Sequence, residues 1–475
     1  MSDLYDKLLA YSDSDYYPYH MPGHKRNLGG LAIEGIKKLD ITEIEGFDNL
    51  HDAREILLQI QKKAALIYGA DESYFLVNGS TSGILAAISA ATGEGGKILM
   101  ARNCHKSAYH GAYLRKLNIR YLWPDQNEQF GVSKAVTAKN VEQALNSEND
   151  FQAVLIVSPT YEGYVADIAS IAEVVHKKNI PLIVDEAHGA HLGFHPAWAQ
   201  NSTRLGADLV IQSLHKTLPS LTQTAILHVR GELIDRKLLN RFLHIYQTSS
   251  PSYVFMAAME DAIDLVDRNR NDLFHNFLTL WKDMINRLNS FKCIHVLQDL
   301  NTDIGKLVFS DFSRNYSGKE LYDILLNQYH LQMEMTSGNY VLAMFTIGDT
   351  KEGYDRLVNA LLEIDKMCQM AGKKDFSNQF TVTLGHKPVS VCSLQEAWEA
   401  STKKILLHDA IDSVTAEFIN LYPPGIPYLV PGEKLTKEDC LSLQSYMENG
   451  FSVQGIENSN TGIYVSVLEG ITESE

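Results

Sequence analysis

The sequence predicts an α/β protein whose largest part is a mostly parallel, doubly wound sheet. Short β-rich runs alternate with helical segments between residues 70 and 230, a pattern typical of parallel strands joined by crossover helices. Several of the β-rich runs, such as residues 153–157, are entirely apolar, as expected for strands buried on both faces. The chain of 475 residues also exceeds the usual size of one domain, so we expect smaller α/β units beside the sheet.

The expected elements follow the chain in order. Apolar residues at helical spacing predict a first helix near residues 53–68. Strands are then expected at residues 74–77, 97–100, 119–123, 153–158, 181–184, 208–212 and 225–229, with helices at 82–91, 105–116, 141–146 and 168–178. Residues 231–290 are predicted to be mostly helical. Beyond them we expect strands at 306–310 and 340–345 and helices at 318–328 and after residue 350.

This order divides the chain into four predicted parts. Residues 1–50 form an N-terminal arm, 51–270 the large sheet domain, 271–370 a small α/β domain and 371–475 a C-terminal domain. In an open parallel sheet the functional site lies outside the carboxyl ends of the strands. The residues that follow each predicted strand are therefore the candidates for the site.

Composition and charge exclude several classes of function. The formal net charge is −16 and no basic cluster stands out, so nucleic acid is not an expected partner. No run approaches the ~20 apolar residues that a membrane helix needs. The five cysteines are scattered without a Cys-x-x-Cys pair, and the first residues lack the features of a signal peptide. We expect a cytoplasmic protein without a membrane partner.

The first candidate segment, Asn78-Gly-Ser-Thr-Ser-Gly83, lies between a predicted strand and a predicted helix. Small residues allow the backbone to approach an anion, and a helix N-terminus offers unpaired N–H groups. Ser80 and Thr81 add hydroxyl donors, so this segment suits a phosphate group. An ordinary turn with a serine or threonine helix cap explains the same residues equally well.

The second candidate segment, Asp185-Glu-Ala-His-Gly-Ala-His191, follows the strand expected at residues 181–184. An acid at the end of a buried strand is poorly solvated and requires a cationic partner. One interpretation is a metal site made by Asp185, His188 and His191. Another is a carboxylate that keeps a pyridine nitrogen protonated, and a third is an aspartate that only caps the next helix.

The third candidate is Lys216 in Ser213-Leu-His-Lys-Thr217, directly after the strand expected at residues 208–212. Lysine is seldom buried without a function. A desolvated lysine has a lowered pKa and becomes a nucleophile. Taken alone, a lysine at such a position is more often a surface lysine whose ammonium group reaches solvent.

Together the three segments are more specific than any one of them. A phosphate cradle, an acid for a ring nitrogen and a lysine for a Schiff base are what a protein must supply to pyridoxal phosphate. They occur in this order, each after a strand of one predicted sheet. The combination predicts a pyridoxal-phosphate enzyme with its cofactor attached to Lys216.

Motifs along nearly the whole chain support the same interpretation. The sequence resembles the ornithine/lysine/arginine decarboxylase family, whose members have the aspartate-aminotransferase-like fold. The matching motifs are Met21-Pro-Gly-His-Lys25, Phe75-Leu-Val-Asn-Gly-Ser-Thr81, Arg102-Asn-Cys-His-Lys-Ser107, Asp185-Glu-Ala-His-Gly-Ala-His191, Ser213-Leu-His-Lys-Thr-Leu-Pro219, Gln247-Thr-Ser-Ser-Pro-Ser-Tyr253 and Tyr422-Pro-Pro-Gly-Ile-Pro427. The large N-terminal wing domain of some members is absent from this sequence, which resembles the shorter branch.

The resemblance implies roles for the site residues. Catalysis would rest on Lys216 as the Schiff-base lysine, Asp185 as the partner of the ring nitrogen and His105 stacked on the ring. The expected cofactor contacts are Ser80, Thr81, His105, Asp185, Ala187, His188, Ser213, His215 and Lys216. His191 is then expected to be structural, and no metal is expected.

The resemblance also implies a reaction and its partners. The expected reaction is decarboxylation of arginine, lysine or ornithine to a polyamine-type amine and CO2, with Glu334, Glu417 or Glu433 as candidates for binding the distal cation. The expected assembly is a homodimer with the site at the interface, and larger rings are compatible with it. An aminotransferase or aldolase on the same fold, or a weakly active regulatory homologue that binds the cofactor, are the alternatives.

Overall fold

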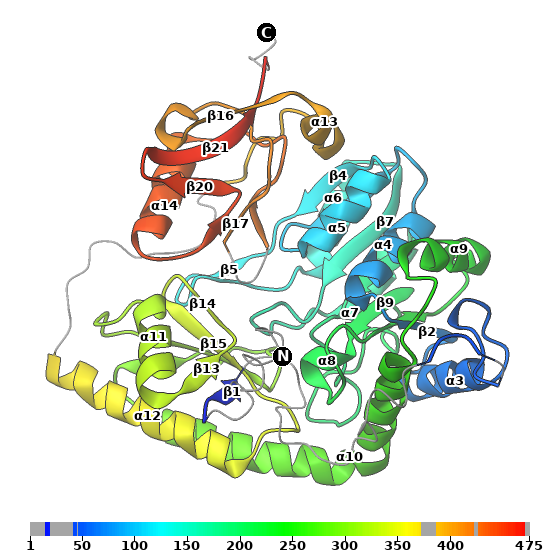
Figure 1. Cartoon of the computed structure of the whole chain (residues 1–475), viewed down its shortest axis with the longest axis horizontal. Helices are drawn as coiled ribbons and strands as arrows, with labels where there is room; N and C mark the ends of the chain where they lie inside the picture. The colour runs from blue at the N-terminus through cyan, green and yellow to red at the C-terminus, as the bar shows by residue number, and fades with distance from the viewer. Residues whose placement is uncertain (1–14, 20–40, 45, 372–385, 422–425, 471–475) are drawn as a thin grey trace.

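The computed structural model describes residues 15–19, 41–44, 46–371, 386–421 and 426–470 (Figure 1). The predicted loop at residues 21–25 and the first four residues of the motif at 422–427 lie outside these ranges. No helix in the described ranges is long and apolar enough to span a bilayer.

The largest sheet has seven strands in the order β2-β10-β9-β8-β7-β3-β4. Its strands are β2 (Glu72–Leu76), β3 (Lys97–Ala101), β4 (Asn118–Leu122), β7 (Phe151–Val157), β8 (Leu182–Asp185), β9 (Leu209–Ser213) and β10 (Ala225–Val229). Each lies within two residues of a predicted strand. Strand β10 runs antiparallel to both of its neighbours, β2 and β9, and the other neighbouring pairs of this sheet are parallel, so the predicted mostly parallel α/β fold is confirmed.

Helices packed against this sheet position the loops at its carboxyl edge. They include α3 (Ile56–Tyr68), α4 (Gly79–Ala91), α5 (Lys106–Leu114), α6 (Ala138–Ser147), α7 (Ile168–His176) and α9 (Arg236–Tyr246). The α4 helix approaches the sheet closely because Gly83 lacks a side chain. A Cβ at Gly83 would lie 2.5 Å from Leu76 Cδ1 and 3.0 Å from Ile211 Cγ2.

A second unit follows the long helix α10 (Tyr253–Leu288), which bends at Asn269, where φ is −113° and ψ is 16°. Its four-stranded antiparallel sheet has the order β11-β12-β15-β14. The strands are β11 (Ile294–Val296), β12 (Lys306–Asp311), β14 (Met335–Ser337) and β15 (Tyr340–Met344), and the helices are α11 (Gly318–Tyr329) and α12 (Lys351–Ala371). The N-terminal strand β1 (Tyr17–Tyr19) pairs with β13 (Leu331–Met333) of this unit.

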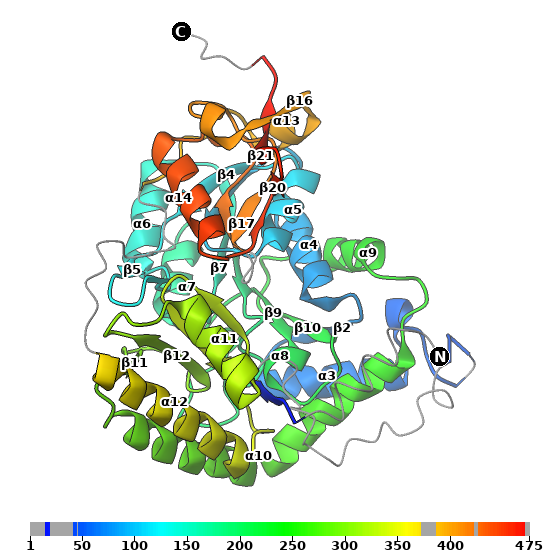
Figure 2. The ribbon, with the colours of Figure 1, turned by 60° about the vertical axis from the view of Figure 1, so that its left-hand side comes forward.

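The C-terminal unit contains two three-stranded sheets, β16-β21-β20 and β18-β17-β19. Its elements are α13 (Leu394–Glu399), β16 (Thr402–Leu406), β17 (Ile419–Leu421), β18 (Pro427–Leu429), α14 (Lys437–Glu448), β19 (Val453–Gln454), β20 (Ile456–Ser459) and β21 (Gly462–Leu468). Both views place this unit beside β4 and α5 of the large sheet (Figures 1 and 2).

A buried arginine joins the C-terminal unit to the large sheet. Arg102 follows β3 and is 3% exposed. Its Nη2 donates to Glu433 Oε2 at 3.0 Å and to the Tyr428 carbonyl at 3.0 Å, and its Nη1 donates to the Pro427 carbonyl at 2.8 Å. Glu433 is 2% exposed, so this ion pair is shielded from water and holds the two units together.

We expect Glu433→Gln to lower the free energy of unfolding by about 3–5 kcal/mol, because it leaves the Arg102 guanidinium buried without a counter-charge. Urea unfolding followed by circular dichroism measures the change. Glu457→Gln is the matched control: Glu457 pairs with Lys404 on the surface, where the loss should be about 1 kcal/mol or less. Equal losses in the two variants would contradict the structural role of the buried pair.

Candidate active site

The candidate site lies at the carboxyl edge of the seven-stranded sheet, where β7, β8 and β9 end. Lys216 belongs to the short helix α8 (Leu214–Thr217), which begins directly after β9. Leu214 and Leu218 on either side of it are fully buried and fix this turn against the core. The Lys216 side chain is partly buried, and burial lowers the pKa of its amine, although the carboxylates of Asp185 and Glu334 act in the opposite direction.

A chain of three nitrogen-bearing side chains runs through the site. Lys216 Nζ lies 3.1 Å from His188 Nε2, and His188 Nδ1 lies 2.7 Å from Lys306 Nζ. Lys306 starts strand β12 of the second unit and is 6% exposed. Burial lowers the pKa of Lys306 to about 8, and burial beside the two lysines lowers the pKa of His188 well below its ordinary value. The neutral His188 ring therefore links the two amines.

Asp185 ends β8 and is 5% exposed. One of its carboxylate oxygens accepts the backbone N–H of Ala187 at 3.1 Å. Burial raises the pKa of Asp185, while the nearby Lys216 opposes this shift. Within the described part of the chain no basic side chain forms an ion pair with Asp185, so this buried acid lacks a paired counter-charge.

His105 caps the N-terminus of α5, just after β3. Its Nδ1 accepts the backbone N–H of Ser107 at 3.2 Å. Burial, with Lys216 adding to it, lowers the pKa of His105 to about 4. The ring is therefore neutral at pH 7, and because Nδ1 is an acceptor its proton lies on Nε2.

The predicted phosphate residues lie on two segments of the large sheet unit. Ser80 and Thr81 are in the first turn of α4, whose N-cap Asn78 makes no side-chain cap. The Ser213 hydroxyl at the end of β9 is buried and has no hydrogen-bond partner among the described residues. His215 Nδ1 lies 3.0 Å from the Thr224 carbonyl, and burial lowers the pKa of His215 to about 4.

The three predicted substrate acids have different surroundings. Glu334 lies close enough to Lys216 to affect its pKa, and Glu334 also accepts a hydrogen bond from the Tyr161 hydroxyl. Glu433 is held in the buried pair with Arg102. Glu417 is exposed. The structure brings only Glu334 of these three to Lys216 within the described chain.

The hydrogen bond that the structure gives the His191 side chain is to an acid outside the predicted site residues. The His191 Nε2 lies 2.9 Å from Asp303 Oδ1. Across the described ranges, no group of three or more histidine, cysteine or acidic side chains is arranged to hold a metal. His191 and Asp303 thus form a separate buried pair.

Sequence reasoning missed Tyr161, Glu162 and Lys306. The Tyr161 ring centroid is 4.7 Å from that of His188, and Lys306 Nζ lies 5.6 Å from the Tyr161 ring centroid. Tyr161 and Glu162 follow β7 in the same way that Asp185 and Lys216 follow their strands, so the strand-end rule would have found them. Lys306 begins a predicted strand, and nothing in its own segment indicates that it reaches His188.

Comparisons with known proteins define the class of this chain. Residues 2–332 match the family model described as "Orn/Lys/Arg decarboxylase, major domain", and residues 377–469 match "Orn/Lys/Arg decarboxylase, C-terminal domain". With the fold described above, these matches define a pyridoxal-phosphate-dependent amino-acid decarboxylase. The chain belongs to the Orn/Lys/Arg decarboxylase family.

Individual relatives span nearly the whole chain. It is 31% identical to an arginine decarboxylase of Bacillus subtilis, over 96% of each chain. It is 24% identical to the constitutive lysine decarboxylase of Escherichia coli, over 97% of this chain and 81% of the relative. The lysine decarboxylase structure from Francisella novicida has a TM-score of 0.80 at 20% identity, over 98% of this chain and 80% of the other, a similarity of fold.

Lys306→Met is expected to raise the pKa of Lys216, because it removes a positive charge held one histidine away. Only the neutral amine reacts with an aldehyde. When pyridoxal phosphate is added to the cofactor-free protein, a visible absorbance band develops at a rate that increases with pH. The midpoint of that increase should therefore lie at a higher pH in the variant than in the wild type. Lys306→Arg keeps the charge and serves as the control. An unchanged pH midpoint in Lys306→Met would contradict the coupling.

Proposed function

We propose that this chain decarboxylates a basic amino acid, arginine in the first place, with pyridoxal phosphate attached to Lys216. The observation that carries the proposal is the buried carboxyl edge of the sheet, where Lys216 and Asp185 lie within electrostatic reach of each other. The family membership supports decarboxylation of this substrate class. The arginine decarboxylase name of the Bacillus subtilis relative favours arginine within it.

The residues at this edge fit the proposed cofactor. Asp185 is a buried acid without an ion-pair partner in the described chain, as a pyridine nitrogen requires. The buried Ser213 hydroxyl without a partner and the uncapped N-terminus of α4, with Ser80 and Thr81, suit a phosphate group. Ala187 is small and His105 is aromatic, which suits a flat ring between them. His188 and His215 would lie at its edge.

The cofactor, when bound, supplies an electron sink for the electron pair of the bond between the α-carbon and the carboxylate. Residues of the chain supply the protons and hold the substrate in the orientation in which this bond breaks. If the Lys306 ammonium donates to His188 Nδ1, the proton of the neutral His188 ring lies on Nε2 and points to Lys216 Nζ. His188 can then pass a proton to Lys216 and recover one from Lys306.

A second proton source lies on the other side of the site. The neutral His105 ring carries its proton on Nε2, since Nδ1 accepts from Ser107. We assign to Lys216 or His105 the proton that replaces the lost carboxylate on the α-carbon. The Tyr161 ring lies beside His188 and its hydroxyl donates to Glu334, and exclusion of water by a bound substrate would strengthen the electrostatic interactions in the site.

The proposal includes a homodimer and a cytoplasmic setting. All five cysteines are free thiols, which suits a reducing compartment. Glu417 is exposed, and in a dimer it is available to the neighbouring copy's site. We keep the division into an arm at 1–50, a large domain at 51–270, a small domain at 271–370 and a C-terminal domain at 371–475 as part of the proposal.

Replacing Lys216 by alanine is expected to abolish both the visible absorbance band of the cofactor-loaded protein and the release of CO2 from arginine. An absorbance scan and a CO2 assay on the same sample measure the two effects. Lys177→Ala, at an exposed lysine that caps the C-terminus of α7, should leave both unchanged. A band that persists in Lys216→Ala would contradict the assignment of the lysine.

Arginine should give the highest kcat/KM of arginine, lysine and ornithine. The measurement is CO2 release together with identification of the amine product by mass spectrometry. A preference for lysine or ornithine would contradict the assignment of arginine as the substrate, while the assignment of decarboxylation would stand. A keto acid or an aldehyde without CO2 would favour transamination or aldol cleavage, and a cofactor band without any product would favour a regulatory homologue.

A further inference from the structure

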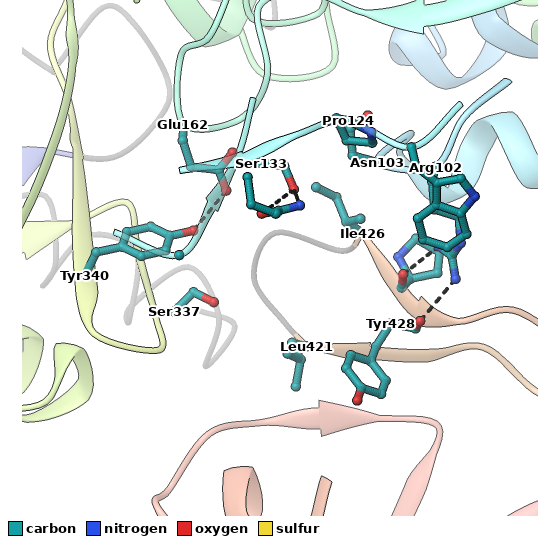
Figure 3. A pocket seen from close by; sticks show the side chains of 14 residues that line it. Arg102, Asn103, Pro124, Ser133, Glu162, Ser337, Tyr340, Leu421, Ile426 and Tyr428 are labelled. Carbon is teal, nitrogen blue, oxygen red and sulfur yellow. Dashed lines mark hydrogen bonds between the residues drawn. The ribbon is translucent and has the colours of Figure 1, made fainter. Parts of the chain in front are cut away.

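Apart from the Lys216 site, a pocket opens where the three units of the chain meet (Figure 3). The large sheet unit contributes loops after β3, β4 and β7, the second unit contributes the β14–β15 hairpin, and the C-terminal unit contributes β17 and β18. The lining residues that matter here are Asn103, Trp123, Ser133, Glu162, Ser337 and Tyr340.

The pocket contains a buried acid without a basic partner. Glu162 is 6% exposed, and its Oε1 accepts the Tyr340 hydroxyl at 2.9 Å. Figure 3 shows the two side chains side by side at one end of the pocket, joined by this hydrogen bond. No ion pair joins Glu162 to a lysine or arginine in the described ranges, and burial raises the pKa of its carboxyl group. Burial of an acid without a counter-charge is costly unless a ligand supplies the charge.

A second acceptor in the pocket has no partner. Asn103 is 8% exposed, and its Oδ1 is buried without a hydrogen bond to any described residue. The hydroxyls of Ser133 and Ser337 and the rings of Trp123 and Tyr340 complete the walls. Carboxylate, amide and hydroxyl oxygens beside aromatic rings are the groups that surround an organic cation.

The cations already near the pocket are engaged elsewhere. Arg102 lines it, but its guanidinium group is neutralised by Glu433 and bonded to the carbonyls of Pro427 and Tyr428. Lys306 lies near enough to Glu162 to influence its pKa, but its ammonium contacts His188. The charge of Glu162 thus remains available to a bound molecule.

The pocket adjoins the Lys216 site through two loops. Glu162 follows Tyr161, whose ring centroid is 4.7 Å from that of His188. Asn103 precedes His105 by two residues in the loop after β3. The loops that supply the pocket's two acceptors therefore also line the Lys216 site.

We propose that this pocket binds an organic cation, a guanidinium or an alkylammonium group, with Glu162 as its counter-charge and Asn103 as a second acceptor. The proposal deepens the proposed function and rests on it in one respect: the cation is then the distal group of the basic amino acid. Glu162 would determine specificity for basic over neutral side chains. A guanidinium offers five N–H donors to these acceptors, whereas a primary ammonium offers three.

The test is the binding of small probes to the cofactor-loaded protein by isothermal titration calorimetry. The probes are n-butylguanidine and N,N-dimethylbutylamine, which are cations without a primary amine, and n-butylurea, a neutral isostere of the first. At least one cation should bind wild-type protein, and more tightly than butylurea. Glu162→Gln should weaken cation binding at least tenfold, because the buried charge pair is lost.

Two further variants control for folding and for chemistry. Glu142→Gln makes the same change on the exposed face of α6 and should leave binding unchanged. Glu162→Asp keeps the charge and should bind the cation more tightly than Glu162→Gln. Equal binding of butylurea and both cations to wild type, or equal binding by Glu162→Gln and wild type, would overturn the proposal.

The same proteins separate this proposal from the proposed function. If butylguanidine binds through Glu162 but no basic amino acid releases CO2, the cation pocket stands and the decarboxylation assignment fails. If arginine releases CO2 with the same KM in Glu162→Gln and wild type, decarboxylation stands and the pocket assignment fails.

Discussion

Desolvation of ionisable side chains at the carboxyl edge of the seven-stranded sheet is the constraint on which the rest of this structure depends. Lys306, Asp185 and Glu162 are each less than 9% exposed, and Lys216 is partly buried beside them. Burial lowers the pKa of both lysines and raises the pKa of both acids. Burial therefore makes the charged form of each group more costly than it is in water, and a ligand or a neighbour of opposite charge offsets that cost.

The fold maintains this desolvation by bringing three units together. Lys306 comes from strand β12 of the second unit, and Tyr340 from the adjacent strand β15. The C-terminal unit closes the other side through the buried pair of Arg102 and Glu433. None of the three units contains the whole site. Docking of the units is therefore part of the chemistry, because separation would hydrate the amines and carboxylates at the edge.

The sequence predicted the strands of the large sheet because each is a short apolar run with turn residues at its ends, and that information is local. It did not predict that β10 runs antiparallel, because direction depends on how the chain returns after α8. The site residues Lys216 and Asp185 were found because they follow strands, and His105 was found only through the family resemblance. Lys306 was not found, since its contact with His188 spans 118 residues and depends on how the second unit docks.

The acids Glu433 and Glu162 show that burial or a family resemblance does not by itself assign a role to an acidic residue. Both are buried to a similar degree, and burial raises the pKa of both. Glu433 was a candidate through the family resemblance, but its carboxylate is paired with the Arg102 guanidinium and joins two units. Glu162 has a tyrosine hydroxyl as its hydrogen-bond donor and no basic partner in the described chain. Because an unpaired buried acid is costly, the pairing of each acid, more than a family resemblance, indicates which one a ligand would meet.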